Sequence, residues 1–131
     1  MAARGVSRRG RTVTVSVSVT LCDSMLESEE AIQQALNEAG TRLTGEALEH
    51  FDTDGSALEV GGERWNTKGR QPKRYQTPYG EVAIKRHVYQ RGGGGKTYCP
   101  LERDGRIVIT STPRLARQVC SKMAQMPAPA V

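Results

Sequence analysis

The clearest pattern in the chain is an alternation of valine with threonine or serine over Thr12–Thr20. A period of two in β-branched residues puts the valines on one face and the hydroxyls on the other, which predicts a β-strand with one buried face. The residues before it are mostly Gly, Ser, Ala and Arg and offer little to bury. We therefore predict a disordered basic arm over residues 1–11, followed by this strand.

A helical period of three and four residues follows the strand. Ser24 followed by Glu27 fits a capping box, and a second serine followed by two glutamates gives another possible helix start. Apolar residues then recur at helical spacing as far as Phe51, with an interruption at Gly40, which is a typical stop or kink. Two short helices, the second capped by Thr44, or one bent long helix are both compatible with this segment.

A β-hairpin is predicted around Pro78-Tyr79-Gly80, because proline and glycine at this spacing are typical of a tight turn. Its strands are expected over Arg74–Thr77 and Glu81–Gln90. The alternation of the second strand gives the hairpin a mainly apolar face, carrying Val82, Ile84 and Val88, and a basic face. The polar stretch Arg64–Lys73 in front of the hairpin is predicted to be a loop.

Weaker signals complete the secondary structure. Leu58–Val60, Thr97–Leu101 and Arg106–Thr110 are candidates for brief strands. Pro113, behind the possible cap Thr112, begins a last helix. Apolar residues recur at helical spacing in this segment, at Leu115, Val119 and Met123.

The length of 131 residues allows one ordinary domain with one modest core. We predict an α+β module over residues 12–124, made of an N-terminal strand, a helical segment, a β-hairpin and a C-terminal helix, with a disordered tail over residues 125–131. Aromatic residues make up 5% of the chain, so we expect an interior of Val, Leu, Ile and Ala.

No apolar run approaches the ~20 residues that a membrane span requires, so no membrane association is expected. The three cysteines are an odd number at wide spacings, which indicates neither a disulfide framework nor a zinc site. We expect them to be reduced, small apolar residues. Reduced cysteines favour the cytoplasm.

Charge is strongly segregated along the sequence. Residues 21–63 carry 11 acidic side chains and one arginine, whereas residues 64–96 carry nine basic side chains and one glutamate. A basic hairpin with interleaved tyrosines could lie along a phosphate backbone, or it could be a solvated surface that balances the acidic helices. The candidate nucleic-acid-binding residues are Lys68, Arg70, Lys73, Arg74, Lys85, Arg86, Arg91 and Lys96.

Two other motifs resemble ligand-binding loops, but each is predicted to be an ordinary turn or loop. The stretch Arg91–Thr97 (RGGGGKT) lacks the first glycine of a phosphate-binding P-loop and leads to Pro100 instead of opening a helix, so a hairpin loop is predicted. Asp52 to Gly55 (DTDG) resembles the opening of a calcium loop, but Gly61 stands where that loop needs a glutamate. A helix-ending turn is therefore predicted there.

A longer series of motifs is similar to the amino-terminal region of bacterial insertion-sequence transposases of the ISKra type. The resemblance covers Ser24 to Ala124, about three-quarters of the chain, and it is most specific where QTPYGEV is followed by HVYQ and CPLE. The stretches that carry it are Ser24–Thr41, Phe51–Ser56, Val60–Gly62, Lys68–Val82, Arg86–Gln90, Gly94–Asp104 and Ile109–Arg114.

The resemblance implies a DDE-type, RNase H-like transposase, in which three carboxylates bind two metal ions that activate a water and then a DNA 3′-hydroxyl. In that family the catalytic domain lies downstream of the matched region. No catalytic or metal-binding role is therefore carried over to these residues, and a divalent metal is implied only for the parent catalytic domain. Residues 125–131 resemble an out-of-frame tail, so a fragment truncated before the catalytic domain is expected.

As a separate chain, such a fragment is not expected to be an enzyme, and no cofactor or small-molecule substrate is expected. It would contact DNA at the element ends or help to assemble the full-length transposase. Two alternatives remain open: a DNA-binding regulator that represses transposition, or a decayed reading frame whose product has no function.

Overall fold

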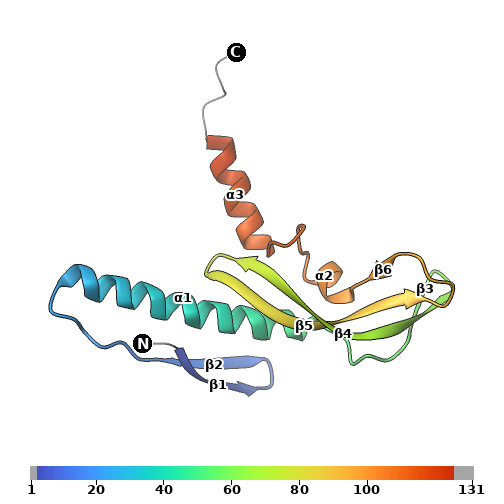
Figure 1. The fold of residues 1–131 in the computed structure, drawn as a ribbon, viewed down its shortest axis with the longest axis horizontal. Helices are drawn as coiled ribbons and strands as arrows, with labels where there is room; N and C mark the ends of the chain where they lie inside the picture. Colours follow the sequence, from blue (N-terminus) through green and yellow to red (C-terminus); the bar gives the residue numbers. More distant parts are fainter. Residues whose placement is uncertain (1–2, 126–131) are drawn as a thin grey trace, which may run out of the picture.

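The computed structural model describes residues 3–125 and contains two antiparallel sheets and three helices (Figure 1). The predicted α+β class is confirmed. In chain order the elements are β1 Ala3–Arg9, β2 Thr12–Val17, α1 Met25–His50, β3 Leu58–Val60, β4 Glu63–Thr77, β5 Gly80–Arg91, β6 Thr97–Tyr98, α2 Pro100–Asp104 and α3 Pro113–Gln125.

The predicted N-terminal strand exists as β2, but it has a partner that the sequence did not predict. Residues 3–9, expected to be part of a disordered arm, form β1 and pair antiparallel with β2. The strands are joined across Gly10 and Arg11, and Gly10 has a φ of 61°, which glycine adopts without strain. Val13 and Val15 are half-buried and their hydroxyl neighbours are exposed, as the alternation predicted, but the strand ends at Val17, which is itself exposed.

The helical segment is one helix, α1, and Gly40 neither stops nor breaks it. The predicted cap is correct, since the Ser24 Oγ accepts a hydrogen bond of 3.1 Å from the backbone N–H of Glu27. Gly40 is buried under the ring of Tyr79, and a Cβ at this position would lie 2.2 Å from Tyr79 Cγ. The glycine is therefore explained by close packing rather than by helix termination.

The hairpin is longer than predicted. β4 begins at Glu63, so the expected loop Arg64–Lys73 is wrong and most of it is paired with β5. The register shifts between Thr67 and Arg70, where Gly69 has a φ of 95°, and this irregularity accounts for the absence of a clean alternation in the sequence. The predicted turn is correct: Thr77 pairs with Gly80 across Pro78 and Tyr79.

The two brief strands predicted over Thr97–Leu101 and Arg106–Thr110 are only partly present, since the first is a strand only at Thr97–Tyr98 (β6) and the second is not a strand. Pro100–Asp104 forms the short helix α2, with its proline in the first turn, where the missing N–H costs nothing. Within residues 106–110, Val108 makes one isolated bridge, to Ser111. The chain then runs beside the end of β4, where the Gln76 N–H donates to the Thr110 carbonyl at 2.7 Å and the Thr112 N–H donates to the Gln76 carbonyl at 2.9 Å.

The core is small and lies where α1 and α2 meet the hairpin. Leu48 of α1 and Leu101 of α2 pack with Tyr75 of β4 and Ile84 of β5. The expectation of a purely aliphatic interior is wrong, because Tyr75 and Tyr89 are completely buried. Each hydroxyl has hydrogen-bond partners, which lets a tyrosine fill an interior position.

The last helix, α3, was predicted correctly and projects away from the rest of the molecule (Figure 1). The expected side-chain cap is wrong, because the Thr112 hydroxyl is buried without a hydrogen-bond partner among the described residues. The expected tail lies outside the described residues except for Gln125, where α3 ends. No helix within residues 3–125 combines the length and the apolar character that a membrane crossing needs.

Candidate nucleic-acid interface

The two faces of the β4–β5 hairpin differ in what they carry. Residues paired directly across an antiparallel ladder lie on the same face, and neighbours along a strand lie on opposite faces. Tyr75 pairs with Val82 and Lys73 pairs with Ile84, so these four side chains share the face that meets the core. The other face carries the alternate residues of both strands.

Three basic residues lie together on this other face. Lys85 pairs with Pro72, which stands between Arg70 and Arg74 on β4. All three basic side chains are exposed, and Lys68 is exposed in the irregular segment next to them. We call the surface formed by Lys68, Arg70, Arg74 and Lys85 the open basic face.

The open basic face is only lightly neutralised. Arg74 is 74% exposed, and its NH1 lies 3.7 Å from the Glu81 carboxylate, which is itself about half exposed. A pair of this kind in water contributes little, so both groups stay available to other partners. The Arg70 guanidinium donates to the backbone carbonyl of Lys85 at 3.4 Å, which holds the arginine along the sheet.

Two of the predicted basic residues are held on the core side instead. The Glu102 carboxylate of α2 accepts a hydrogen bond of 2.6 Å from Lys73 Nζ and another from the Tyr75 hydroxyl. Arg86 is only 11% exposed, donates from Nε to the Tyr75 hydroxyl at 3.0 Å, and lies 3.7 Å from Glu102. Both cations therefore share a single carboxylate on the core side of the hairpin, instead of facing outward with the open basic face.

The protonation states of this network follow from its contacts. Burial and the hydrogen bond to Glu102 raise the pKa of the Tyr75 hydroxyl, so Tyr75 remains a donor at neutral pH. Burial also opposes ionisation of Glu102, but the hydrogen bonds from Lys73 and Tyr75 prevail and lower its pKa. The carboxylate thus stays charged and joins α2 to the hairpin.

The glycine-rich segment is the predicted hairpin loop, and it joins β5 to β6. At its base the Arg91 guanidinium contacts the Glu63 carboxylate at 3.0 Å and lies over the Trp65 ring. Lys96 is exposed within the loop. Arg91 is therefore paired, whereas Lys96 is open but lies outside the open basic face.

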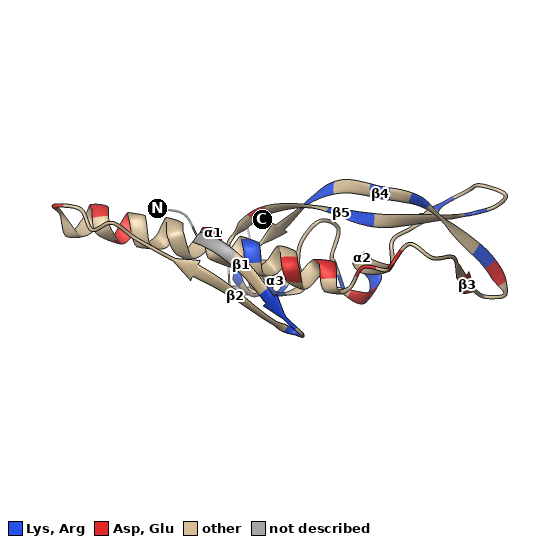
Figure 2. Cartoon of the chain, turned by 90° about the horizontal axis from the view of Figure 1, so that it is seen from below, with Lys and Arg blue, Asp and Glu red and all other residues tan. Residues whose placement is uncertain are grey.

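The eight predicted residues thus divide into three groups. Four of them make up the open basic face, Lys73 and Arg86 balance Glu102, and Arg91 and Lys96 belong to the glycine-rich end. Figure 2 shows basic segments along β4 and β5 and acidic segments along α1. The charge segregation seen in the sequence is therefore also a segregation in space.

The aspartates of the DTDG motif serve the fold. Asp52 accepts hydrogen bonds from the His87 backbone N–H at 3.1 Å and from the His87 ring at 3.0 Å, while Asp54 accepts from the Ser56 N–H at 2.9 Å. The Tyr89 hydroxyl also donates to the Ser56 carbonyl at 2.8 Å. The predicted turn is confirmed, and within residues 3–125 no group of three or more His, Cys, Asp or Glu is placed to hold a metal ion.

The sequence did not predict a second basic site at the β1–β2 turn. Arg8 and Arg11 lie against His50 at the end of α1, with guanidinium-to-ring distances of 3.5 and 3.4 Å. Arg8 also lies 3.8 Å from the Glu46 carboxylate. The sequence shows that the first 11 residues are basic, but nothing in it indicates that these arginines have a partner about 40 residues away in the chain.

The three cysteines are free, as expected. Cys99 is half-buried beside the core, and burial raises the pKa of its thiol. Cys22 and Cys120 are exposed, which differs from the expected apolar role.

No family model, no curated protein and no solved structure matches this chain, so the comparisons with known proteins add no family to these observations.

Proposed function

We propose that this chain is the DNA-contacting module of an ISKra-type transposase and that its open basic face lies along the phosphate backbone of the element ends. The observation that carries the proposal is the arrangement of Arg70, Arg74 and Lys85 on one exposed face, where the ion pair of Arg74 with Glu81 is solvent-exposed. The resemblance supports it, because the matched stretch Lys68–Val82 contains most of this face.

The spacing of the open basic face suits a duplex. Arg70 and Arg74 are four residues apart on β4, which at ~3.3 Å per residue separates them by roughly 13 Å. Four base-pair steps at ~3.4 Å per step cover about the same length of DNA. Two arginines on one strand can therefore reach phosphates several steps apart, while Lys85 contacts the backbone between them.

The position of the open basic face also suits a binding surface. The opposite face of the hairpin is fixed to α1 and α2 through Leu48, Leu101 and Glu102. A cationic surface held on a rigid sheet loses little conformational freedom when it binds. We propose that this binding takes place in the cytoplasm, and the proposal assigns no catalytic step to the residues described.

The test is to neutralise the face and compare it with an equal loss of charge elsewhere. Arg70→Gln, Arg74→Gln and Lys85→Gln together are expected to weaken binding to an element-end duplex on the order of 100-fold at ~0.1 M salt, since each phosphate contact changes log K by ~0.9 per decade of salt. Fluorescence anisotropy measures the change in affinity.

The matched control is Arg42→Gln, Arg103→Gln and Arg106→Gln, which removes the same charge from exposed positions on α1 and around α2. It is expected to bind within a few-fold of wild type. Equal weakening in both triple variants would show that net charge alone drives binding, and the proposed face would then be wrong.

A further inference from the structure

Helix α3 has a polar side and an apolar side. At ~100° per residue, Arg114, Gln118 and Ser121 fall within roughly 60° of one another around the helix axis. All three side chains are exposed. We call these three residues the α3 polar side. The large apolar residues of the helix recur on the other side, and they are Leu115, Val119 and Met123.

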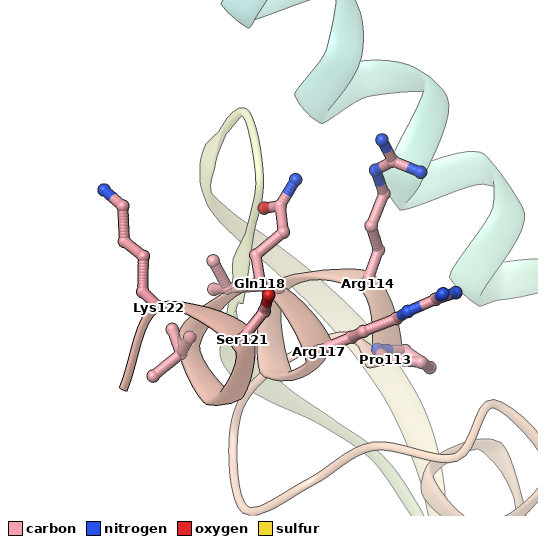
Figure 3. A pocket seen from close by; sticks show the side chains of 8 residues that line it. Pro113, Arg114, Arg117, Gln118, Ser121 and Lys122 are labelled. Atoms are coloured by element: carbon pink, nitrogen blue, oxygen red, sulfur yellow. The ribbon is translucent and has the colours of Figure 1, made fainter. Parts of the chain in front are cut away.

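The charge of α3 is entirely positive. Its basic residues are Arg114, Arg117 and Lys122, and the helix carries no acidic residue. Figure 3 shows the side chains around a shallow pocket lined by α3 itself: Arg114 and Gln118 extend in the same direction, whereas Arg117 and Lys122 point away from each other. The helix therefore presents hydrogen-bonding side chains within a positive surface, and no carboxylate of its own competes for them.

The start of α3 is fixed close to the open basic face. The Thr112 N–H donates to the Gln76 carbonyl at 2.9 Å, at the end of β4, and the later turns of the helix project from the molecule (Figure 1). Arg74 and Arg114 each lie two residues from this hydrogen bond. Their backbones are therefore within roughly 20 Å of each other, so one duplex can contact both.

We propose that the α3 polar side enters the major groove of bound DNA and reads its base sequence. The inference rests on the proposed function, since the open basic face holds the backbone of the same duplex. The major groove is ~12 Å wide and admits an α-helix. Arginine makes two hydrogen bonds to guanine, glutamine makes two to adenine, and serine bonds to either base. Helix α3 thus supplies the sequence information that phosphate contacts lack.

The spacing of Arg114 and Gln118 defines the expected recognition sequence. Four residues along a helix advance by ~6 Å, and base pairs follow one another at ~3.4 Å. The two side chains therefore reach bases about two steps apart. We expect a guanine and an adenine at this fixed separation in the preferred duplex.

An anionic membrane is the other surface that a basic amphipathic helix can bind, and α3 fits it less well. Such helices insert an apolar side that is rich in tryptophan, phenylalanine or leucine. α3 has 13 residues and no aromatic residue, and its one leucine, Leu115, is half-buried. The features that distinguish α3 are the arginine and glutamine of its polar side, which match base edges.

The test is selection from a pool of duplexes with a randomised centre, followed by sequencing of the bound DNA. Wild type is expected to enrich the guanine and the adenine on the order of 10-fold per position. Arg114→Ala with Gln118→Ala is expected to lose this enrichment and to keep its salt-dependent binding to the pool, because the open basic face is intact. The matched control, Val119→Ala with Met123→Ala, changes the apolar side and is expected to keep the enrichment.

The variants are expected to fold, because alanine is the best helix former and the positions are exposed. Retained binding to the pool confirms this for each variant. Wild type that binds the pool without enriching any sequence would overturn this inference and leave the proposed function standing, whereas wild type that does not bind DNA would overturn both. Enrichment that survives Arg114→Ala with Gln118→Ala, or that the apolar-side control also abolishes, would show that the α3 polar side is not the reader. Sedimentation of wild type with phosphatidylserine vesicles that this control abolishes would assign α3 to a membrane instead.

Discussion

Replacing Asp52 by alanine is expected to lower the free energy of unfolding by about 2–4 kcal/mol, because the change leaves a backbone N–H and an imidazole without their charged acceptor. The Asp52 side chain is only 8% exposed and His87 is only 15% exposed, so water replaces the lost hydrogen bonds poorly. Urea unfolding monitored by circular dichroism measures the loss. Asp52→Asn, which keeps one oxygen acceptor, is expected to lose less.

The control for this prediction is Asp54→Ala. Among the residues that the structure describes, Asp54 accepts hydrogen bonds only within its own turn, from Ser56, and these lower the pKa of its carboxyl. We expect the unfolding midpoint of this variant to stay close to wild type, and we expect Mg²⁺ or Mn²⁺ to leave the wild-type midpoint unchanged. A stabilisation by these ions that either aspartate variant abolishes would show that the two carboxylates form a metal site.

Replacing Gly40 by alanine is expected to destabilise the protein by roughly 1–3 kcal/mol, although alanine is the better helix former. The added Cβ would lie 2.2 Å from Tyr79 Cγ, and the next two ring atoms would be within 2.7 Å. The ring would have to leave its position at the tip of the hairpin, which loosens the packing of β4–β5 on α1.

A double-mutant cycle with Tyr79→Ala identifies the cause. Without the ring, Gly40→Ala is expected to stabilise α1 by up to ~1 kcal/mol, because glycine in a helix interior costs that much relative to alanine. The substitution should therefore change sign between the two backgrounds. Destabilisation of the same size in both would mean that Tyr79 is not the reason for the glycine.

The parts of the fold predicted from the sequence are those set by local physics. The serine cap at Ser24, the turn at Pro78 and Tyr79 and the helix beginning at Pro113 depend on residues a few positions apart. The alternation of Val82, Ile84 and Val88 also identified the buried side of β5 correctly. Each signal acts within one element and needs no knowledge of what packs against it.

The errors arose where a distant partner decides the structure. β1 contains little that favours a strand and exists through its pairing with β2, while Gly40 continues a helix because Tyr79 occupies the space above it. Arg86 looked like an exposed cation, but its strand position places it beside Tyr75 and Glu102. The charge counts gave the number of basic residues in this segment, but they could not show which of those residues face outward.

The most direct test of the proposed function is the salt dependence of binding to an element-end duplex and to a scrambled duplex of the same composition. Four phosphate contacts from the open basic face predict that log K falls with log salt with a slope of about −3.6. We expect this slope on both duplexes, because phosphate contacts carry no sequence information, and we expect Arg70→Gln, Arg74→Gln and Lys85→Gln together to reduce it to about −0.9. The same slope in wild type and in this triple variant would contradict the proposed face, because it would indicate general attraction of a basic protein to DNA.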